Sequence, residues 1–350
     1  MITPALGEND TAGTGRGGAD RRDTTGAAAW RGGWRRAIRA ASRPGPWKRG
    51  LVLAALALLL GLLMMLHAHI PNGTRNLGSL VETFLPWFGL FVPVLLAGAL
   101  WRRSASAVAA LLLPVTVWLN LFGGLFTGTS HADGDLTLVS HNVGAANPDP
   151  VGTARALAAS GADVLALEEL TEEARGTYVT ELAKAYPYHT VQGTVGLWST
   201  LPLSDTRPVE VAVSGPRALR TTVATDHGPL AVYVAHLGSV RVDLGGGLAS
   251  GPGDAGARML GAAIAAEPNE RGGLLGDLNG TMEDRAFDGL TARMRSAQDV
   301  AGDGFGFTWP AAFPVARIDQ ILVRGVEPAS AWVLPATGSD HRPVAAGITW

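Results

Sequence analysis

Acidic, amide and imidazole side chains interrupt the apolar stretches in the C-terminal half of this 350-residue chain. They follow or precede segments rich in Leu, Val and Ala, and they are Asn142, Glu168, Glu169, His236, Asp277, Asn279, Asp319, Asp340 and His341. Each has an ordinary explanation when taken alone, but ligands of open α/β sheets collect outside the carboxyl ends of the strands. The chain has no Cys, which excludes thiolate metal sites, disulfides and cysteine catalysis. The oxygen-rich set that remains favours Mg²⁺, with Mn²⁺ as a substitute.

The segments around these residues predict alternating strands and helices. Helices are expected over 153–160, 171–185, 254–266 and 282–290, the second of them capped by Thr171. Short apolar runs predict strands over 136–140, 163–167, 194–198, 209–213, 219–225, 230–235, 273–276, 318–323 and 344–349. This order indicates an α/β domain over 135–350, with two stacked sheets and helices outside. The Gly-rich segment 239–256 is expected to form a mobile loop.

In that order, the motifs resemble those of the endonuclease/exonuclease/phosphatase superfamily, which contains metal-dependent phosphoesterases such as abasic-site endonucleases, neutral sphingomyelinases and inositol-polyphosphate phosphatases. The matching segments are SHNV (140–143), DVLALEEL (163–170), GLWSTLPL (196–203), VAHLGS (234–239), GDLNGT (276–281), RIDQILV (317–323) and GSDHRPV (338–344). GDLN followed later by SDH is a specific combination. The resemblance implies a four-layer α/β sandwich and hydrolysis of a phosphoric ester.

The resemblance also implies a metal site centred on Glu169. The family motif ends in Gln-Glu, whereas this chain has Glu168 and Glu169, so Glu169 is expected to be the leading ligand. Asn142 would orient that site and Asp340 would complete it. Gly144 stands where some nuclease members have an Asp, which makes a nuclease-type variant of the metal centre less favoured.

The remaining motif residues are implied to act in catalysis. Asp277 would position or deprotonate the attacking water, and Asn279 and His236 would donate hydrogen bonds to the phosphoryl oxygens. His341 would pair with Asp319, because a carboxylate beside an imidazole fixes its tautomer and favours its charged form. Whether that pair acts as a base or stabilises the transition state is left open by the sequence.

The N-terminal part of the chain predicts a membrane domain over 50–127. Three apolar stretches lie at 51–70, 80–101 and 105–126, and each is long enough for a helix to cross the hydrocarbon core of a bilayer. The first 50 residues carry ten Arg and Lys, whereas the loop after the first stretch carries only Arg75. This bias predicts a basic, disordered cytoplasmic tail over 1–49 and a catalytic domain outside the cell membrane. A signal peptide is the alternative for the first stretch, but it lacks a small-residue cleavage site.

Aromatic residues lie near the ends of these predicted spans. Those expected to anchor the helices at the membrane interface are Trp47, Trp87, Trp101 and Trp118. Packing between helices is an equal alternative for Trp87 and Trp118. His67 and His69 are expected to be interfacial rather than a metal pair, because a spacing of two places them on different helix faces.

With the apolar stretches included, the whole chain is similar to the membrane-anchored VanJ-type proteins of actinobacteria, which are associated with teicoplanin resistance. The segment HIPNGTRNLGSLVETFLPW (69–87) carries much of that similarity. The expected substrate is therefore a phosphate or pyrophosphate of a lipid-linked molecule of the cell envelope. Residues 131–350 carry fifteen Arg and Lys against twenty-five Asp and Glu, a formal charge of −10, so nucleic acid is not an expected partner. An exported nuclease and a non-catalytic envelope-binding protein are the alternatives.

Overall fold

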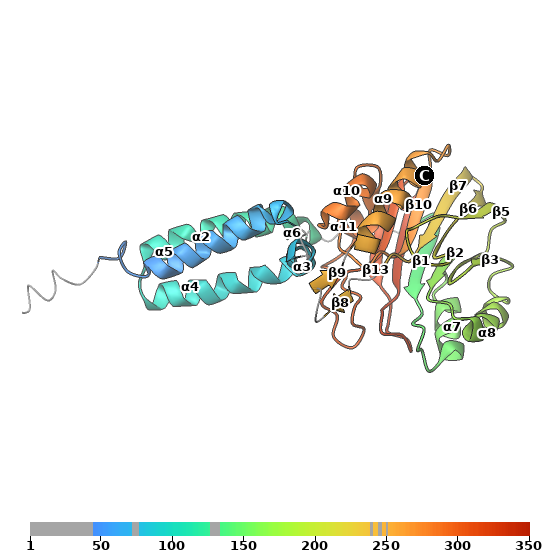
Figure 1. The fold of residues 1–350 in the computed structure, drawn as a ribbon, viewed down its shortest axis with the longest axis horizontal. Helices are drawn as coiled ribbons and strands as arrows, with labels where there is room; N and C mark the ends of the chain where they lie inside the picture. Colours follow the sequence, from blue (N-terminus) through green and yellow to red (C-terminus); the bar gives the residue numbers. More distant parts are fainter. Residues whose placement is uncertain (1–44, 72–76, 127–133, 239–240, 244–246, 250) are drawn as a thin grey trace, which may run out of the picture.

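The computed structural model of the chain describes residues 45–71, 77–126, 134–238, 241–243, 247–249 and 251–350. We call residues 45–126 the helical region and residues 134–350 the α/β domain. The two lie end to end, with the helices side by side in the helical region and the strands of the α/β domain beyond them (Figure 1). The predicted tail over 1–49 lies almost entirely outside the described residues.

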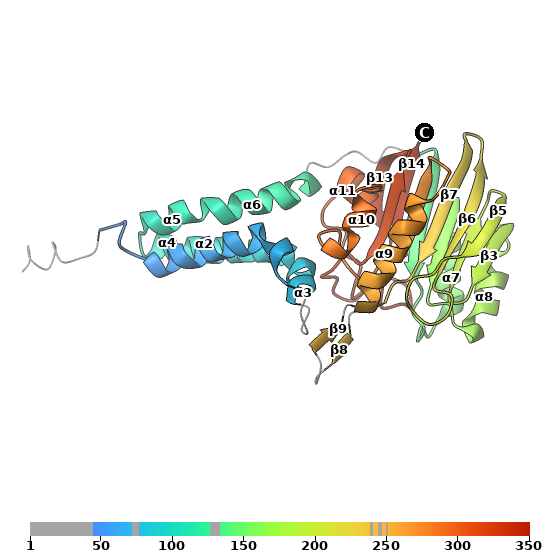
Figure 2. The ribbon, with the colours of Figure 1, turned by 45° about the horizontal axis from the view of Figure 1, so that its top comes forward.

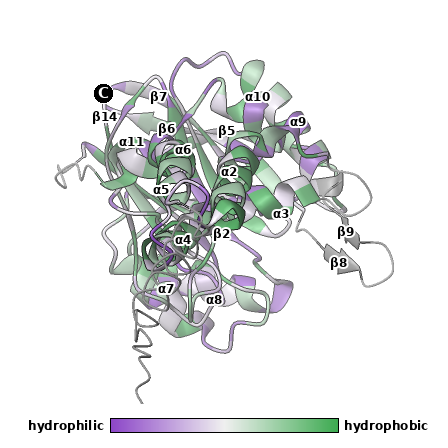
Figure 3. Ribbon diagram, turned by 90° about the vertical axis from the view of Figure 1, so that its left-hand side faces the viewer, coloured by the Kyte–Doolittle hydropathy of each residue, from purple (hydrophilic) through white to green (hydrophobic). Residues whose placement is uncertain are grey.

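The helical region consists of short, apolar helices packed along one another. They are α2 (Leu51–Met65), α3 (Leu77–Thr83), α4 (Phe91–Trp101), α5 (Ala105–Ala110) and α6 (Leu112–Phe122), with the 3₁₀ turns η1 (His67–His69), η2 (Leu85–Leu90) and η3 (Gly123–Phe126). A Cβ atom on Gly61 of α2 would lie 2.6 Å from Leu113 of α6, so glycine allows these helices to approach closely. Figure 3, which views the molecule from this end, shows mostly apolar residues along α2 and α6.

The helices of this region agree only in part with the three predicted membrane spans. By length and composition, one helix in the described part of the chain can cross a membrane: the 22-residue run Ala105–Phe126. At the second predicted span, α3 and the helix Leu85–Trp101 are long and apolar enough to cross a membrane only when they are taken together, and they meet at an angle of 65°. The first predicted span contains α2, which has 15 residues. These residues therefore do not form three straight helices of membrane length, and multiple membrane spans stay a prediction.

One sheet of the α/β domain, sheet A, has the strand order β13-β14-β1-β2-β4-β3. Its strands are β1 (Leu136–Asn142), β2 (Val164–Glu168), β3 (Tyr188–Gln192), β4 (Val195–Ser199), β13 (Glu327–Val333) and β14 (Val344–Thr349). The central strand β1 pairs parallel with β2 and antiparallel with β14. This pairing places Asn142 opposite Glu168, at the end of the sheet where polar residues were expected.

The second sheet, sheet B, has the order β11-β12-β10-β7-β6-β5. Its strands are β5 (Leu203–Pro208), β6 (Ala218–Thr225), β7 (Gly228–Ala235), β10 (Gly272–Asp277), β11 (Arg295–Ser296) and β12 (Asp319–Arg324). Strand β10 pairs parallel with β7 and antiparallel with β12, which places Asp277 opposite Asp319. The register therefore brings two predicted catalytic carboxylates together.

The sheets stack through apolar side chains, and helices cover their outer faces. Leu138 and Val164 of sheet A meet Leu219 and Val232 of sheet B in the core between the sheets. The next residue of β2, Leu165, packs outward against helix α7 (Pro150–Ala158) and helix α8 (Glu172–Leu182). Burial on both faces explains why these strands are apolar throughout. The predicted sandwich of two sheets between outer helices is confirmed.

Helices α9 (Gly251–Ala265) and α10 (Asp288–Thr291) cover sheet B, with α9 running along the outer face (Figure 2). Beside them are α11 (Ala297–Ala301), η4 (Arg285–Phe287) and the short hairpin of β8 (Arg241–Asp243) and β9 (Gly247–Ala249).

Three predicted elements differ from the structure. In place of the helix expected over 282–290, the chain forms a turn, then the 3₁₀ turn η4 and the four-residue helix α10. No strand is present at 209–213, where the chain forms bends although Val211 is buried. Helix α9 begins at Gly251 rather than at Asp254, so it takes up the end of the Gly-rich segment that was expected to be a loop. The other Gly-rich residues include positions outside the described ranges.

Aromatic side chains join the helical region to the α/β domain. Phe305 of the α/β domain lies edge-on to Phe122 and Phe126, with ring centroids 5.8 and 5.4 Å away, and also contacts Trp118. Trp87 stacks on Phe307 at 5.5 Å. Trp87 and Trp118 therefore pack within the protein, whereas Trp47 and Trp101 are exposed as interfacial anchors would be.

Candidate active site

The predicted site residues come from both sheets and meet at one end of the sandwich. Six of them line one cavity of about 460 Å³, and they are Glu169, His236, Asp277, Asn279, Asp340 and His341. The other two lie directly behind them: Asn142 donates a hydrogen bond to Asp277, and Asp319 accepts one from His341. All eight residues proposed from the sequence are therefore brought together.

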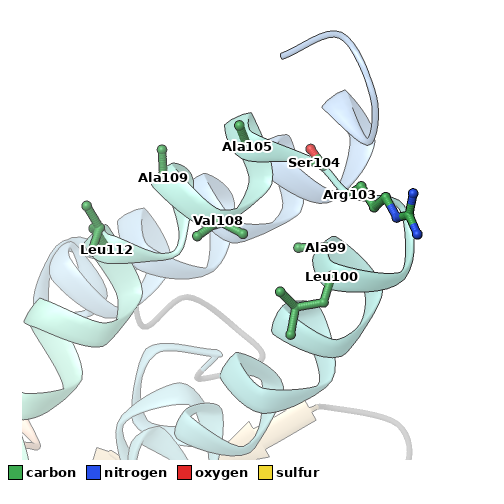
Figure 4. A pocket seen from close by; sticks show the side chains of 8 residues that line it. All are labelled: Ala99, Leu100, Arg103, Ser104, Ala105, Val108, Ala109 and Leu112. Carbon is green, nitrogen blue, oxygen red and sulfur yellow. The ribbon is translucent and has the colours of Figure 1, made fainter. Parts of the chain in front are cut away.

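A second cavity, of about 450 Å³, lies between α4 and α5 at the end of the helical region far from the α/β domain (Figure 4). Its lining is apolar apart from Arg103 and Ser104 in the turn between the helices. It holds no carboxylate or imidazole, so the chemistry belongs to the first cavity.

Asp277 is the centre of the site and is buried. Its Oδ2 accepts a hydrogen bond from Nδ2 of Asn142 at 2.9 Å, and its Oδ1 accepts one from the backbone N–H of Asn279 at 2.9 Å. The Nε2 atoms of His236 and His341 lie 3.7 and 3.8 Å from Oδ2. Burial, aided by the charge of Asp319, raises the pKa of Asp277 above its ordinary value. Asp277 is thus a stronger base than an ordinary Asp.

Glycine before Asp277 permits this position. Gly276 has φ 151°, and a Cβ atom on it would collide with the carbonyl oxygen of Ala235. Ala235 directly precedes His236, so the close approach of the two strand ends brings Asp277 beside His236. The Gly in the GDLN motif is required by this contact.

His341 and Asp319 form a buried ion pair. Nδ1 of His341 lies 2.9 Å from Oδ2 and 3.1 Å from Oδ1 of Asp319. Burial alone would lower the pKa of His341, but the hydrogen bond and charge of Asp319 outweigh it and raise the pKa to about 9. The imidazole is therefore protonated at neutral pH, with its Nε2–H pointing toward Asp277 and the cavity.

Glu168 and Glu169, at the end of β2, differ in their surroundings. The Glu168 carboxylate is fully buried, accepts a hydrogen bond from Ser140 at 3.1 Å, and has its pKa raised well above the ordinary value by burial. Glu169 faces the cavity, and its Oε2 accepts a hydrogen bond from the backbone N–H of Ala145 at 2.9 Å. Burial pushes its pKa upward, but Ala145 and His236 outweigh burial and lower the pKa. Glu169 is therefore the anionic member of the pair that faces the cavity.

The backbone of Glu169 is strained. Its φ of 58° lies in the left-handed region, which glycine and Asn adopt far more readily than Glu. Such a conformation costs on the order of 1 kcal/mol and persists only where the surroundings enforce it. It turns the Glu169 side chain toward the cavity.

His236 has a cationic neighbour that the sequence analysis missed. Nη2 of Arg217 lies 2.5 Å from Nδ1 and 2.8 Å from Nε2 of His236, and both residues line the cavity. Burial lowers the pKa of His236, and the Arg217 charge lowers it further, although Asp277 opposes them. His236 is therefore held neutral beside a permanent positive charge. Arg217 belongs to no recognisable motif, and only the pairing of β6 with β7 reveals its place.

Asp340 completes the rim of the cavity and is exposed. The preceding residue fixes its loop, because the Ser339 hydroxyl donates to the carbonyl oxygen of Asn142 at 2.6 Å and accepts from the His341 N–H at 3.1 Å. The SDH motif is thereby tied to the end of β1.

Two sets of residues are available to a divalent cation. Asp277, Asp319 and His341 have potential ligand atoms within 4.8 Å of one another. The imidazole of that set is paired with Asp319 and protonated at neutral pH, and a coordinating His must be neutral. The set predicted from the sequence offers the Glu169 carboxylate, with its lowered pKa, near the Asn142 amide and Asp340. These oxygen ligands fit a hard cation such as Mg²⁺ better than the set that contains the protonated imidazole.

Comparison with known proteins gives a consistent result. The family model described as "Endonuclease/Exonuclease/phosphatase family" matches residues 139–341, more than half of the chain. The solved structure of a mannosyl-6-phosphatase from Bacteroides thetaiotaomicron is similar over 62% of this chain and 100% of that one, with a TM-score of 0.51 and 15% identity. The structure of an endonuclease/exonuclease/phosphatase from Beutenbergia cavernae is similar over 61% of this chain and 71% of that one, with a TM-score of 0.52 and 17% identity.

The beta toxin of Staphylococcus aureus has the same similarity in fold, with a TM-score of 0.50 and 16% identity over 61% of this chain and 99% of the toxin. No curated protein sequence is significantly similar to the chain. At these identities the solved structures show a shared fold.

Proposed function

Because the chain belongs to the endonuclease/exonuclease/phosphatase family, we propose that it is a metal-dependent phosphoesterase with its active site at Asp277 and His341. One observation carries the proposal: a carboxylate with a raised pKa and a protonated imidazole face the same cavity. Hydrolysis of a phosphoric ester needs both a base for the attacking water and positive charge for the phosphoryl oxygens.

In this proposal Asp277 removes a proton from the attacking water. Its raised pKa makes it an effective base, and the hydrogen bonds from Asn142 and Asn279 fix its orientation. His341 donates its Nε2–H to a phosphoryl oxygen, while Asp319 keeps the imidazole charged and holds the ring in place.

Arg217 supplies further positive charge on the His236 side of the cavity. Its planar guanidinium is suited to binding two phosphoryl oxygens at once. A divalent cation would be held by Glu169, Asn142 and Asp340, where it would neutralise phosphoryl charge and lower the pKa of a water molecule.

We further propose that the helical region anchors the protein in a membrane, with the α/β domain on the outer face. In the run Ala105–Phe126, only 22% of an 18-residue apolar stretch is buried within the protein, unlike the core helix of a soluble domain. Many large apolar side chains of α2, α4 and α6 are exposed, and an apolar surface of this extent favours contact with lipid. The ten basic residues before α2 support the proposed orientation.

The proposed substrate is a phosphate or pyrophosphate on a lipid carrier of the cell envelope, such as undecaprenyl pyrophosphate. The formal charge of −10 on residues 131–350 disfavours a polyanionic polymer, although a small headgroup held by a metal is compatible with it. The similarity to VanJ-type proteins supports a contribution to teicoplanin resistance, by analogy alone.

The test is a set of phosphate compounds offered to the purified protein in detergent with Mg²⁺. Undecaprenyl pyrophosphate, a soluble phosphomonoester, a soluble phosphodiester and duplex DNA are compared for wild type and Asp277→Ala. We expect phosphate release from the lipid with wild type and none with Asp277→Ala. Cleavage of DNA or the diester without release from the lipid would leave the phosphoesterase class standing and refute the lipid carrier.

A further inference from the structure

The cavity that holds the catalytic residues is not formed by the α/β domain alone. Thr83 and Phe84, at the end of α3, line it together with Asp277 and His341. Helix α3 lies between the other helices and the α/β domain in both views of the fold (Figures 1 and 2). The helical region therefore contributes one wall of the active site.

The cavity combines charged and apolar side chains. The catalytic carboxylates and imidazoles share its lining with the apolar side chains of Phe84, Trp309, Ala316 and Ile318, of which Phe84 comes from the helical region. Phe84 and Trp309 are each 38% exposed, although burial of large aromatic rings is strongly favourable. Two partly exposed rings beside a charged site are suited to an apolar group that enters the same cavity.

A buried ion pair holds this wall in place. Glu82, directly before Thr83, is the single acidic residue between Asp23 and Asp133, and it is fully buried. Its Oε1 accepts hydrogen bonds from Nε and Nη2 of Arg285 at 3.2 and 2.9 Å. Nη2 of Arg285 also donates to the carbonyl oxygen of His67 at 3.3 Å.

Arg285 belongs to η4, in the segment that follows Asn279. The loop that follows the GDLN motif is thus bonded to η1, directly after α2, and to the last turn of α3. A charge buried in this way is stable only when its partner stays in position. The pair therefore fixes Thr83 and Phe84 relative to Asp277.

Trp87 gives a second fixed point on the other side of Phe84. Its Nε1–H donates to the carbonyl oxygen of Val315 at 2.8 Å, and its ring stacks on Phe307. Val315 directly precedes Ala316, which lines the cavity. Phe84 is held between two contacts with the α/β domain, the Glu82–Arg285 pair before it and Trp87 after it.

We propose that Phe84, together with Trp309, is a specificity-determining residue that binds the apolar chain of a phosphorylated lipid next to the phosphate. The inference rests on the proposed function and deepens it, because it names the residues that would select a lipid substrate. The phosphate occupies the side with Asp277 and His341, and the chain leaves along Phe84 toward the apolar helices. Glu82 and Arg285 are positioning residues for this wall.

The test compares two diphosphates that differ in the length of their apolar part, farnesyl and isopentenyl diphosphate, with the full-length protein in detergent and Mg²⁺. Phe84→Ala is expected to raise KM for the farnesyl compound about tenfold, as the loss of apolar contacts in a pocket does. The kcat/KM for the isopentenyl compound should stay within twofold. Leu80→Ala is the matched control, because Leu80 lies on α3 and is 41% exposed but does not line the cavity. It should change neither substrate.

Glu82→Gln should reduce the preference for the long chain as Phe84→Ala does, because it loosens the wall without changing its surface. Equal losses on both diphosphates in Phe84→Ala would overturn the inference, since a merely structural role affects both alike. Binding of farnesyl and isopentenyl monophosphates, measured by calorimetry, separates the two proposals. If the longer compound binds more tightly, in a way that depends on Phe84, but neither diphosphate is hydrolysed, the proposed function is refuted and the role of Phe84 in binding the apolar chain is supported. Equal binding of the two compounds would refute that role of Phe84.

Discussion

Replacing Asp319 by Asn should release His341 from its charged state. The side chain of His341 is 8% exposed, so water replaces little of what the carboxylate provides. A pKa of about 9, against an ordinary 6.5, corresponds to a preference for the protonated form of roughly 3 kcal/mol, at 1.36 kcal/mol per unit. The substitution Asp319→Asn keeps the size of the side chain but removes its charge, so burial should bring the pKa of His341 to 6.5 or below.

The assay is an NMR titration of the metal-free protein with ¹⁵N-labelled histidines, in which His341→Gln identifies the His341 signal. Wild type should show an imidazole that titrates near pH 9, and Asp319→Asn should shift it by at least two pH units. Because the folded pKa is raised, the pair stabilises the protein fully below about pH 6.5 and loses this contribution as the pH rises through about 9. An unchanged titration near pH 9 in Asp319→Asn would refute the assignment of the charge to this pair.

Other perturbations test the metal site, a second buried ion pair and the topology. Glu169→Gln should weaken Mg²⁺ binding, measured by calorimetry, because Glu169 faces the cavity. Glu168→Gln should not, because Glu168 is bonded to Ser140 and does not line the cavity. The reverse result would assign the metal ligand to Glu168. Glu267→Gln should lower the free energy of unfolding by about 3–5 kcal/mol at pH 7, because it leaves Arg220 buried without its partner. Burial raises the pKa of Glu267, but the hydrogen bonds from Arg220 outweigh it and lower the pKa to about 2. The ion pair should therefore stabilise wild type fully above about pH 4.5, and this stabilisation should be lost as the pH falls toward 2. A free energy of unfolding that differs equally between wild type and Glu267→Gln at all these pH values would contradict it. A reporter that works only in the cytoplasm, fused after Trp350, should be silent, and a strong signal would reverse the proposed topology.

The sandwich could be predicted because the sequence repeats one arrangement. Strands such as β2 are apolar on both faces, and polar residues follow or precede several strands where the site residues meet. The strand expected at 209–213 shows the limit of this signal. Val211 is buried, so apolar content marked burial correctly, but burial does not specify hydrogen-bonded pairing.

The helical region was harder to predict for a local reason. Hydropathy alone treats 80–101 as one apolar stretch, yet the chain bends by 65° between Thr83 and Leu85. Pro86 lacks a backbone N–H and disfavours helical conformation in the residue before it, which explains a break at this point. The exact span geometry therefore depends on one residue rather than on composition.

The site could be predicted where a residue lies in a motif and could not where it reaches the cavity from elsewhere. Asp277, His341 and their neighbours share local patterns with a known family. Arg217 and Phe84 have no such pattern, and each lines the cavity only because of how β6 and α3 pack against other elements. Long-range packing of this kind is invisible to spacing along the chain.

The central claim is that a divalent cation and Asp277 act together on a phosphoric ester. The most direct measurement is phosphate release by full-length protein that has been stripped with a chelator and then supplied with increasing Mg²⁺, for wild type and Asp277→Asn. Wild type should be inactive without metal and regain activity to saturation, while Asp277→Asn should stay about 10²–10⁴-fold slower at saturating Mg²⁺, as expected for loss of a general base. Full activity of the stripped wild type, wild-type rates in Asp277→Asn, or no release from any phosphate ester at any Mg²⁺ concentration would contradict the account.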